Sequence, residues 1–84
     1  MIEIGMEIYN GGDRANPDHF ATITNIESGR FGTIVTLQEI DDPAHEYKIN
    51  DYQIEDVYSG NGSTRIVTKA AYLKHRAEAI RSMM

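Results

Sequence analysis

The residues best suited to chemistry lie in the loop YNGGDRANPDH, where Asp13, Asp18 and His19 could offer ligands to a metal ion. A calcium loop of the EF-hand type needs oxygen ligands at alternate positions, and Ala15 and Pro17 interrupt that pattern. Asp18 and His19 are neighbours, so their side chains diverge if they lie in a strand. The Asn, Gly and Asp residues are typical of turns in which side chains bond to nearby backbone. We therefore expect no metal site and no cofactor.

The remaining candidates for catalysis show no catalytic spacing. His19, His45 and His75 are far apart in the sequence and form no HxxxH or HxH pattern. There is no cysteine nucleophile, and no serine lies in a nucleophile-elbow pattern. The acid pairs Asp41-Asp42 and Glu55-Asp56 could meet another carboxylate in space, but solvated turns explain them as well. We expect a protein that is not an enzyme.

The charges of the chain are unevenly distributed. The net charge is −5, with twelve acids and three bases in residues 1–63, against five bases and one acid in residues 64–84. An acidic body should repel nucleic acid, because affinity for nucleic acid comes from neutralising phosphates. No apolar run reaches the length of about 20 residues that a membrane span needs, and the N-terminal stretch has no signal-peptide core. With no cysteine for a disulfide, we expect a cytoplasmic location.

The first 58 residues predict a small antiparallel β structure with strands every eight to fifteen residues. Alternation places Ala21 and Ile23 inward, with Ile26 following after a bulge. In the next strand the apolar row is Phe31, Thr33, Val35 and Leu37, and in the fourth strand it contains Tyr47 and Ile49. The expected elements are a strand at Met6–Tyr9, a loop at Asn10–Asp18, two strands at His19–Ile40 joined at Ser28–Arg30, a strand at His45–Asn50, a helical turn at Asp51–Ile54 and a last strand at Glu55–Tyr58.

The end of the chain predicts a separate segment. Residues 59–64 (SGNGST) suggest a flexible linker, and residues 65–84 suggest a short strand followed by a helix that Thr68 caps. Small and apolar side chains fall on one helical stripe at Ala70, Leu73, Ala77, Ile80 and Met84. Basic rows flank that stripe at Lys69, Lys74, Arg76 and Arg81. We expect the stripe to dock on the barrel of its own chain. The alternative is that the helix lies in a groove of a partner or against a second copy.

The order of these elements resembles an SH3-like barrel over about the first sixty residues. The resemblance implies that the long loop is a contact-making loop, with acids at Asp13 and Asp18, and that the aromatic after the helical turn is Tyr58 or Tyr52. Peptide-binding SH3 domains carry a Trp at the start of the third strand, and this chain has none. The resemblance therefore implies the fold without the binding of proline-rich peptides. The chain also has the overall look of small proteins carried by phages and mobile elements.

These observations predict a mainly β protein, an SH3-like barrel of about five strands with one C-terminal helix, that works as a protein-interaction module. The expected contact residues are Asp13, Arg14, Asp18, Tyr52 and Tyr58. One alternative function is an acidic inhibitor that occupies the nucleic-acid-binding surface of a partner protein. Another is nucleic-acid binding through the basic face of the helix. A homodimer formed through the helix is a further possibility, and the identity of the protein partner does not follow from the residues.

Overall fold

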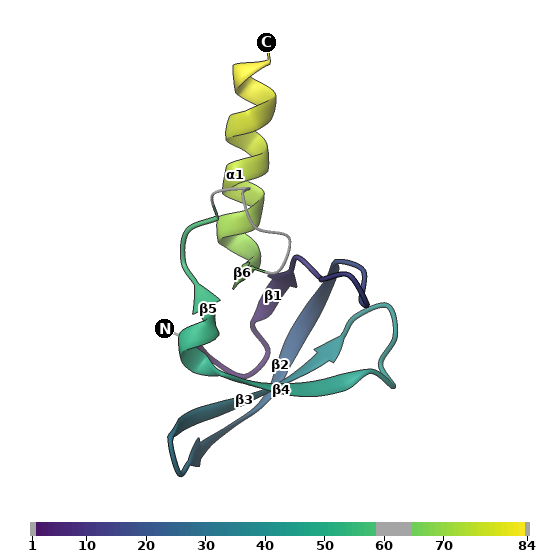
Figure 1. Ribbon diagram of the computed structural model, residues 1–84. Coiled ribbons are helices and arrows are strands. Elements are labelled where there is room, and N and C mark those ends of the chain that lie inside the picture. The colour runs from purple at the N-terminus through teal and green to yellow at the C-terminus, as the bar shows by residue number, and fades with distance from the viewer. Residues whose placement is uncertain (1, 59–64, 84) are drawn as a thin grey trace.

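The computed structural model describes residues 2–58 and 65–83, which form one curled sheet and one helix (Figure 1). The elements in chain order are β1 (Glu7–Asn10), β2 (His19–Gly29), β3 (Gly32–Glu39), β4 (Glu46–Asn50), the 3-10 turn η1 (Asp51–Gln53), β5 (Ile54–Glu55), β6 (Ile66–Thr68) and α1 (Lys69–Ser82). The sheet has the strand order β4-β3-β2-β1-β6-β5 and is antiparallel except between β5 and β6. The expected fold class is confirmed: the protein is mainly β, a half-barrel with a single C-terminal helix.

The long strands β2 and β3 form the hairpin that organises the sheet. Gly29 pairs with Gly32, so the connection consists of Arg30 and Phe31 and lies slightly later than the expected Ser28–Arg30. Gly32 has a φ of +132°, which a residue with a side chain rarely adopts. Phe31 was expected in the apolar row of its strand, but it lies in this turn and is 90% exposed.

The inner face of the sheet holds the core, and the alternation of the sequence predicted most of it. The fully buried members include Ile8, Ala21, Ile23, Val35 and Leu37. The predicted bulge is confirmed, because the register of β2 against β3 shifts between Ile23 and Asn25. Ile26, Tyr47 and Ile49 pack against the buried cluster, as expected from their rows.

The strand expected at Glu55–Tyr58 is the main difference in the sheet. The helical turn is present as η1, but β5 is only Ile54–Glu55, and Val57 beyond it is 75% exposed. The strand beside β1 is instead β6, which pairs with β1 on one side and β5 on the other. The sheet therefore extends beyond the range 1–58 that was expected for the barrel. The expected linker, residues 59–64, lies outside the described residues.

Helix α1 begins at Lys69 and is capped by Thr68, whose side chain accepts a hydrogen bond from the backbone N–H of Ala71, as predicted. The helix then points away from the sheet, and its C-terminal end lies far from every strand (Figure 1). All described residues from Arg76 to Met83 are exposed. Within residues 2–58 and 65–83, no helix has the length and the apolar composition of a membrane-spanning segment.

Candidate functional site

The loop between β1 and β2 is built by turn chemistry, as the sequence suggested. The Asp13 carboxylate accepts hydrogen bonds from the backbone N–H groups of Ala15 and Asn16, both at 2.8 Å. These two bonds lower the pKa of Asp13. Gly12 has a φ of +74°, and its backbone N–H donates to the Asn10 side chain. The loop is therefore held largely by its own polar groups.

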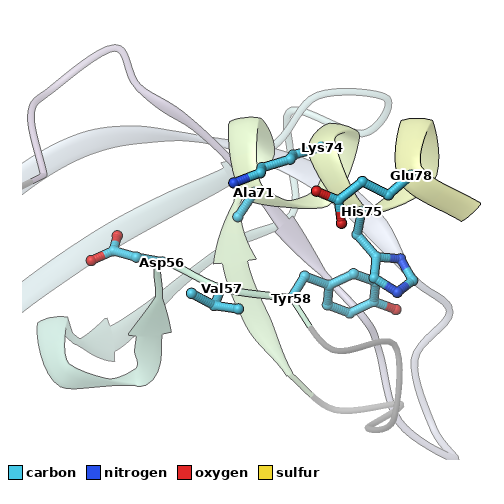
Figure 2. A pocket seen from close by; sticks show the side chains of 7 residues that line it. All are labelled: Asp56, Val57, Tyr58, Ala71, Lys74, His75 and Glu78. Carbon is cyan, nitrogen blue, oxygen red and sulfur yellow. The ribbon is translucent and has the colours of Figure 1, made fainter.

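An aromatic cluster on the outer face of the sheet attaches the helix. Tyr72 of α1 stacks on Tyr9 of β1, with ring centroids 3.9 Å apart and planes 20° apart. Phe20 of β2 and Tyr58 pack against the same two rings, at centroid distances of 5.4–5.9 Å. His75, one turn further along α1, meets Tyr58 edge-on at 5.0 Å. Figure 2 shows these last two side chains next to each other beneath the helix.

The expected contact residues are distributed over three places. Asp18 accepts a hydrogen bond of 2.7 Å from the Tyr9 hydroxyl, so it is linked through Tyr9 to Tyr58 in the aromatic cluster. Asp13 and Arg14 lie exposed in the loop. Tyr52 belongs to η1, is 75% exposed, and its hydroxyl accepts a hydrogen bond from Asn50. Whether these residues bind a partner stays a prediction.

The basic face of the helix is partly engaged within the chain. Lys69 donates to the Glu7 carboxylate at 2.7 Å and lies over the ring of Phe20. Arg76 donates a hydrogen bond of 3.2 Å to the Tyr72 hydroxyl and lies over the Tyr72 ring. The hydrogen bond raises the pKa of Arg76. Lys74 lines a small pocket between α1 and the segment after β5 (Figure 2), while Arg81 is exposed near the helix end.

The expected docking of the apolar stripe differs from the observed contact. Leu73 is 49% exposed and Ile80 is 55% exposed, whereas Tyr72 faces the sheet. The physical reason is the size of the side chains. Two of the five stripe residues are alanine and offer little surface, whereas the rings on the outer face of the sheet give Tyr72 a large surface to pack on. Met84, the last expected member of the stripe, lies outside the described residues.

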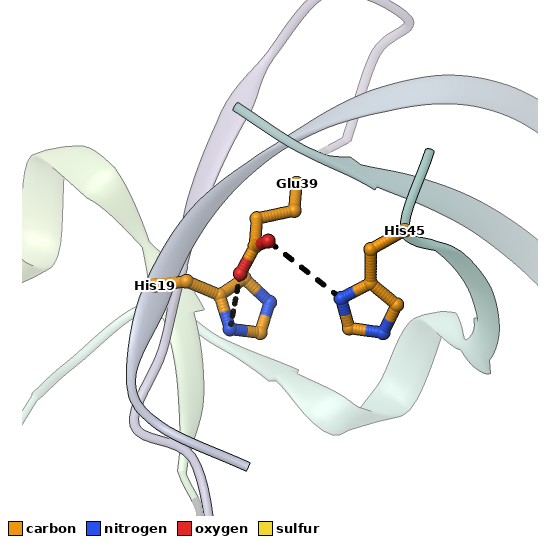
Figure 3. A group of neighbouring side chains, drawn as sticks. All are labelled: His19, Glu39 and His45. Atoms are coloured by element: carbon orange, nitrogen blue, oxygen red, sulfur yellow. Dashed lines mark ion pairs between the residues drawn. The ribbon is translucent and has the colours of Figure 1, made fainter. Parts of the chain in front are cut away.

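A cluster of polar side chains lies on the inner face of the sheet, and the spacing of its residues along the sequence did not reveal it. Figure 3 shows Glu39 of β3 between His19 of β2 and His45, which precedes β4. His19 Nδ1 lies 3.6 Å from Glu39 Oε1, and His45 Nδ1 lies 3.9 Å from Glu39 Oε2. The exposed fractions of the side chains are 7% for His19, 16% for Glu39 and 39% for His45.

Tyr47 of β4 connects this group with a pocket. Its hydroxyl lies 2.8 Å from His19 Nε2 and accepts a hydrogen bond from Asn10 at 3.0 Å. Burial raises the pKa of Tyr47, and the charge of Glu39 adds to this, while the bond from Asn10 opposes it. The pocket has a volume of about 290 Å³ and includes both His19 and His45 in its lining. The site thus joins two imidazoles, a carboxylate and a neutral phenol at the edge of an open cavity.

Comparisons of the chain with models of protein families, with curated proteins and with solved structures found no match.

Proposed function

We propose that this protein is a non-catalytic interaction module that presents the distal part of α1 to a partner protein. The single observation that supports the proposal most is the projection of the helix. Its contacts with the sheet come from the first two turns, and every described residue from Arg76 to Met83 is exposed. A helix of 14 residues is marginal in water without tertiary packing. A partner surface would supply the packing that the chain itself supplies only at the helix base.

The stripe on the projecting helix has the composition of a contact seam. Leu73 and Ile80 are 49% and 55% exposed, and Ala70 and Ala77 alternate with these larger side chains. The spacing of Ala70, Leu73, Ala77 and Ile80 alternates between three and four residues, which is the pattern of a helix packed along one seam. The alanines permit a close approach of the partner.

The charges beside the seam indicate which kind of partner fits. Lys74 and Arg81 flank one side of the stripe, and Lys69 and Arg76 flank the other. Two copies of this helix packed along the same seam would bring bases against bases in either orientation, which disfavours a homodimer. The partner we propose therefore has an apolar helix or groove with acidic residues along its rim.

Affinity capture with matched variants tests this proposal. The bait is the full chain, compared with Leu73→Ser/Ile80→Ser, with Lys74→Glu/Arg81→Glu, and with the control Phe31→Ser. The control removes an apolar side chain of the β2–β3 turn that is more exposed than either helix residue. We expect a host protein that the chain and the control retain and that both helix variants lose. With the purified partner, the affinity should fall as salt rises, because exposed charges are screened.

Two results would overturn the proposal. Recovery of the same proteins by all four baits would show that the helix is not the contact surface. The second result would come from sedimentation equilibrium of the chain alone. A dimer at micromolar concentration that is lost in Leu73→Ser/Ile80→Ser would show that the stripe binds a second copy of the chain and not an acidic partner.

We further propose that the half-barrel is a variant of the SH3-like barrel and that the protein works in the cytoplasm. The long loop after β1, the β2–β3 hairpin and the helical turn after β4 support the first proposal. The absence of cysteine supports the second. An origin in a phage or mobile element is a proposal that rests on the small size and general character of the sequence.

A further inference from the structure

We propose that His19, Glu39 and His45 bind one divalent transition-metal ion, with zinc as the best match. The chemistry of the three side chains supports this choice. Imidazole and carboxylate are common ligands of zinc, and three protein ligands with one open position are the usual arrangement of a zinc ion that also binds water. Calcium and magnesium prefer sites made of oxygen ligands, and the cluster offers only one carboxylate.

The distances place the ligand atoms close to those of a bound site. Zinc bonds of 2.0–2.2 Å in a tetrahedron require ligand atoms about 3.3 Å apart. In the structure one ligand atom from each of the three residues lies within 4.8 Å of the other two. The two histidines contact different oxygens of Glu39, His19 at 3.6 Å from Oε1 and His45 at 3.9 Å from Oε2. A rotation of the His45 side chain, the most exposed of the three, would bring its nitrogen to the spacing that a bound zinc ion requires.

The surroundings of His19 favour a defined ring orientation. A histidine that binds metal through one nitrogen usually donates the N–H of the other to an acceptor that fixes the ring. His19 Nε2 lies 2.8 Å from the Tyr47 hydroxyl, and Nδ1 faces Glu39. Nδ1 is also 3.2 Å from the carbonyl of Pro17. A carbonyl can only accept, so this contact favours the ring proton on Nδ1 while no metal is bound. Metal binding would place the proton on Nε2, which would donate it to the Tyr47 hydroxyl, and would leave the Nδ1 lone pair for the ion.

The pocket beside the cluster provides access. His19, His45, Tyr47 and Asn10 all line the same cavity of about 290 Å³. An ion held between the two histidines would be reached from that cavity and could keep a position for water or another small ligand. The simpler interpretation of the cluster is a carboxylate that pairs with two histidines and binds no metal. A binding experiment separates the two.

Isothermal titration of the untagged full chain with zinc chloride near neutral pH is the experiment. We expect one ion per chain, and an affinity at least tenfold weaker in His45→Gln and in Glu39→Gln. The control is His75→Gln, because the third histidine lies in the aromatic cluster beside Tyr58 and should not affect binding. Tyr47→Phe should weaken binding by about 10–100-fold, since it removes the partner that orients His19. Magnesium should give no saturable heat.

Nuclear magnetic resonance of the imidazoles provides a second measurement on the same samples. Zinc should shift the His19 and His45 ring nitrogens and leave His75 unchanged, and acidification should release the ion because the ligands must lose their protons. Absence of zinc binding with unchanged imidazole signals would show that the cluster is an ion-pair group only. Equal loss of binding in His75→Gln would assign the zinc to scattered surface histidines. Either result would overturn the proposal, and neither bears on the helix as a partner-binding element.

Discussion

Removal of the Tyr72 ring should show how the helix is held. Tyr72 stacks on Tyr9 at 3.9 Å and lies 5.6 Å from Phe20 and 5.4 Å from Tyr58. Each aromatic pair contributes about 0.5–1.5 kcal/mol beyond the burial of its surface. Truncation of a fully buried aromatic costs about 3–5 kcal/mol, and Tyr72 is only half-buried. We therefore expect Tyr72→Ala to lower the free energy of unfolding by about 2–3 kcal/mol.

The neighbouring Leu73 provides the comparison. It belongs to the stripe that sequence analysis expected to dock, yet it is 49% exposed, so Leu73→Ala should cost less than about 1 kcal/mol. Small domains lose about 4–8 °C of melting temperature per kcal/mol, so Tyr72→Ala should melt roughly 8–24 °C below the unmodified chain. Urea unfolding followed by far-ultraviolet circular dichroism measures both losses, and hydrogen exchange along α1 shows whether the helix frays.

The variant Tyr72→Phe is the control for the hydroxyl group. Among the described residues, only the exposed Arg76 donates a hydrogen bond to that hydroxyl. The ring alone should therefore hold the helix, and Tyr72→Phe should change the free energy of unfolding little. If Leu73→Ala cost as much as Tyr72→Ala, or more, the helix would be docked through its stripe, and the description of the aromatic cluster as the attachment would be refuted.

Three further predictions concern the loop, the helix cap and the buried phenol. Gly12→Ala should destabilise the fold more than Gly5→Ala in urea unfolding. Both glycines have positive φ, but a Cβ on Gly12 would lie 2.5 Å from the Asn16 carbonyl oxygen and one on Gly5 would meet nothing within 4 Å. Thr68→Ala should lower the free energy of unfolding by about 1 kcal/mol through loss of the cap, while Thr68→Ser should retain most of it. Burial and the bond to Asp18 raise the pKa of Tyr9, so the folded state favours the neutral phenol. That contribution to stability is complete below the ordinary phenol pKa of about 10 and declines as pH rises above it. In unfolding curves recorded at rising pH, Tyr9→Phe should remove this part of the decline; an unchanged decline would contradict it.

The helix shows where periodicity along the chain stops being informative. A stripe of apolar residues at helical spacing indicates that one face can pack, but it does not say what surface is within reach. The rings that receive Tyr72 come from positions 9, 20 and 58. They meet because β1 pairs with β2 and with β6, and because β5, which precedes Tyr58, pairs with the other side of β6. A tyrosine beside the stripe therefore made the contact, for reasons that are not local to the helix. The cap at Thr68 is local, and it was predicted correctly.

The alternation of the strands contained more information about the cluster of His19, Glu39 and His45 than the spacing of the histidines did. Each of its members continues an inward row of the sheet by one step of two residues: His19 precedes Ala21, Glu39 follows Leu37, and His45 precedes Tyr47. The alternation of each strand was clear from the sequence. The missing information was the register between strands, which decides whether the ends of the rows meet.

That register depends on the bulge in β2. Gly29 pairs with Gly32, and an uninterrupted ladder from this pair would place Glu39 opposite Thr22. The shift between Ile23 and Asn25 places Glu39 opposite Ala21 instead, and a shift of one residue moves every side chain to the other face. Without the bulge, the His19 row and the Glu39 row would lie on opposite faces of the hairpin. The apolar Ile26, which is out of step with Ala21 and Ile23, indicates a bulge in this strand. The sequence does not show which residue is the extra one, because the pattern around Thr24 fits the pairing before the shift as well as the pairing after it. The one extra residue therefore both completes the core and brings a carboxylate between two imidazoles.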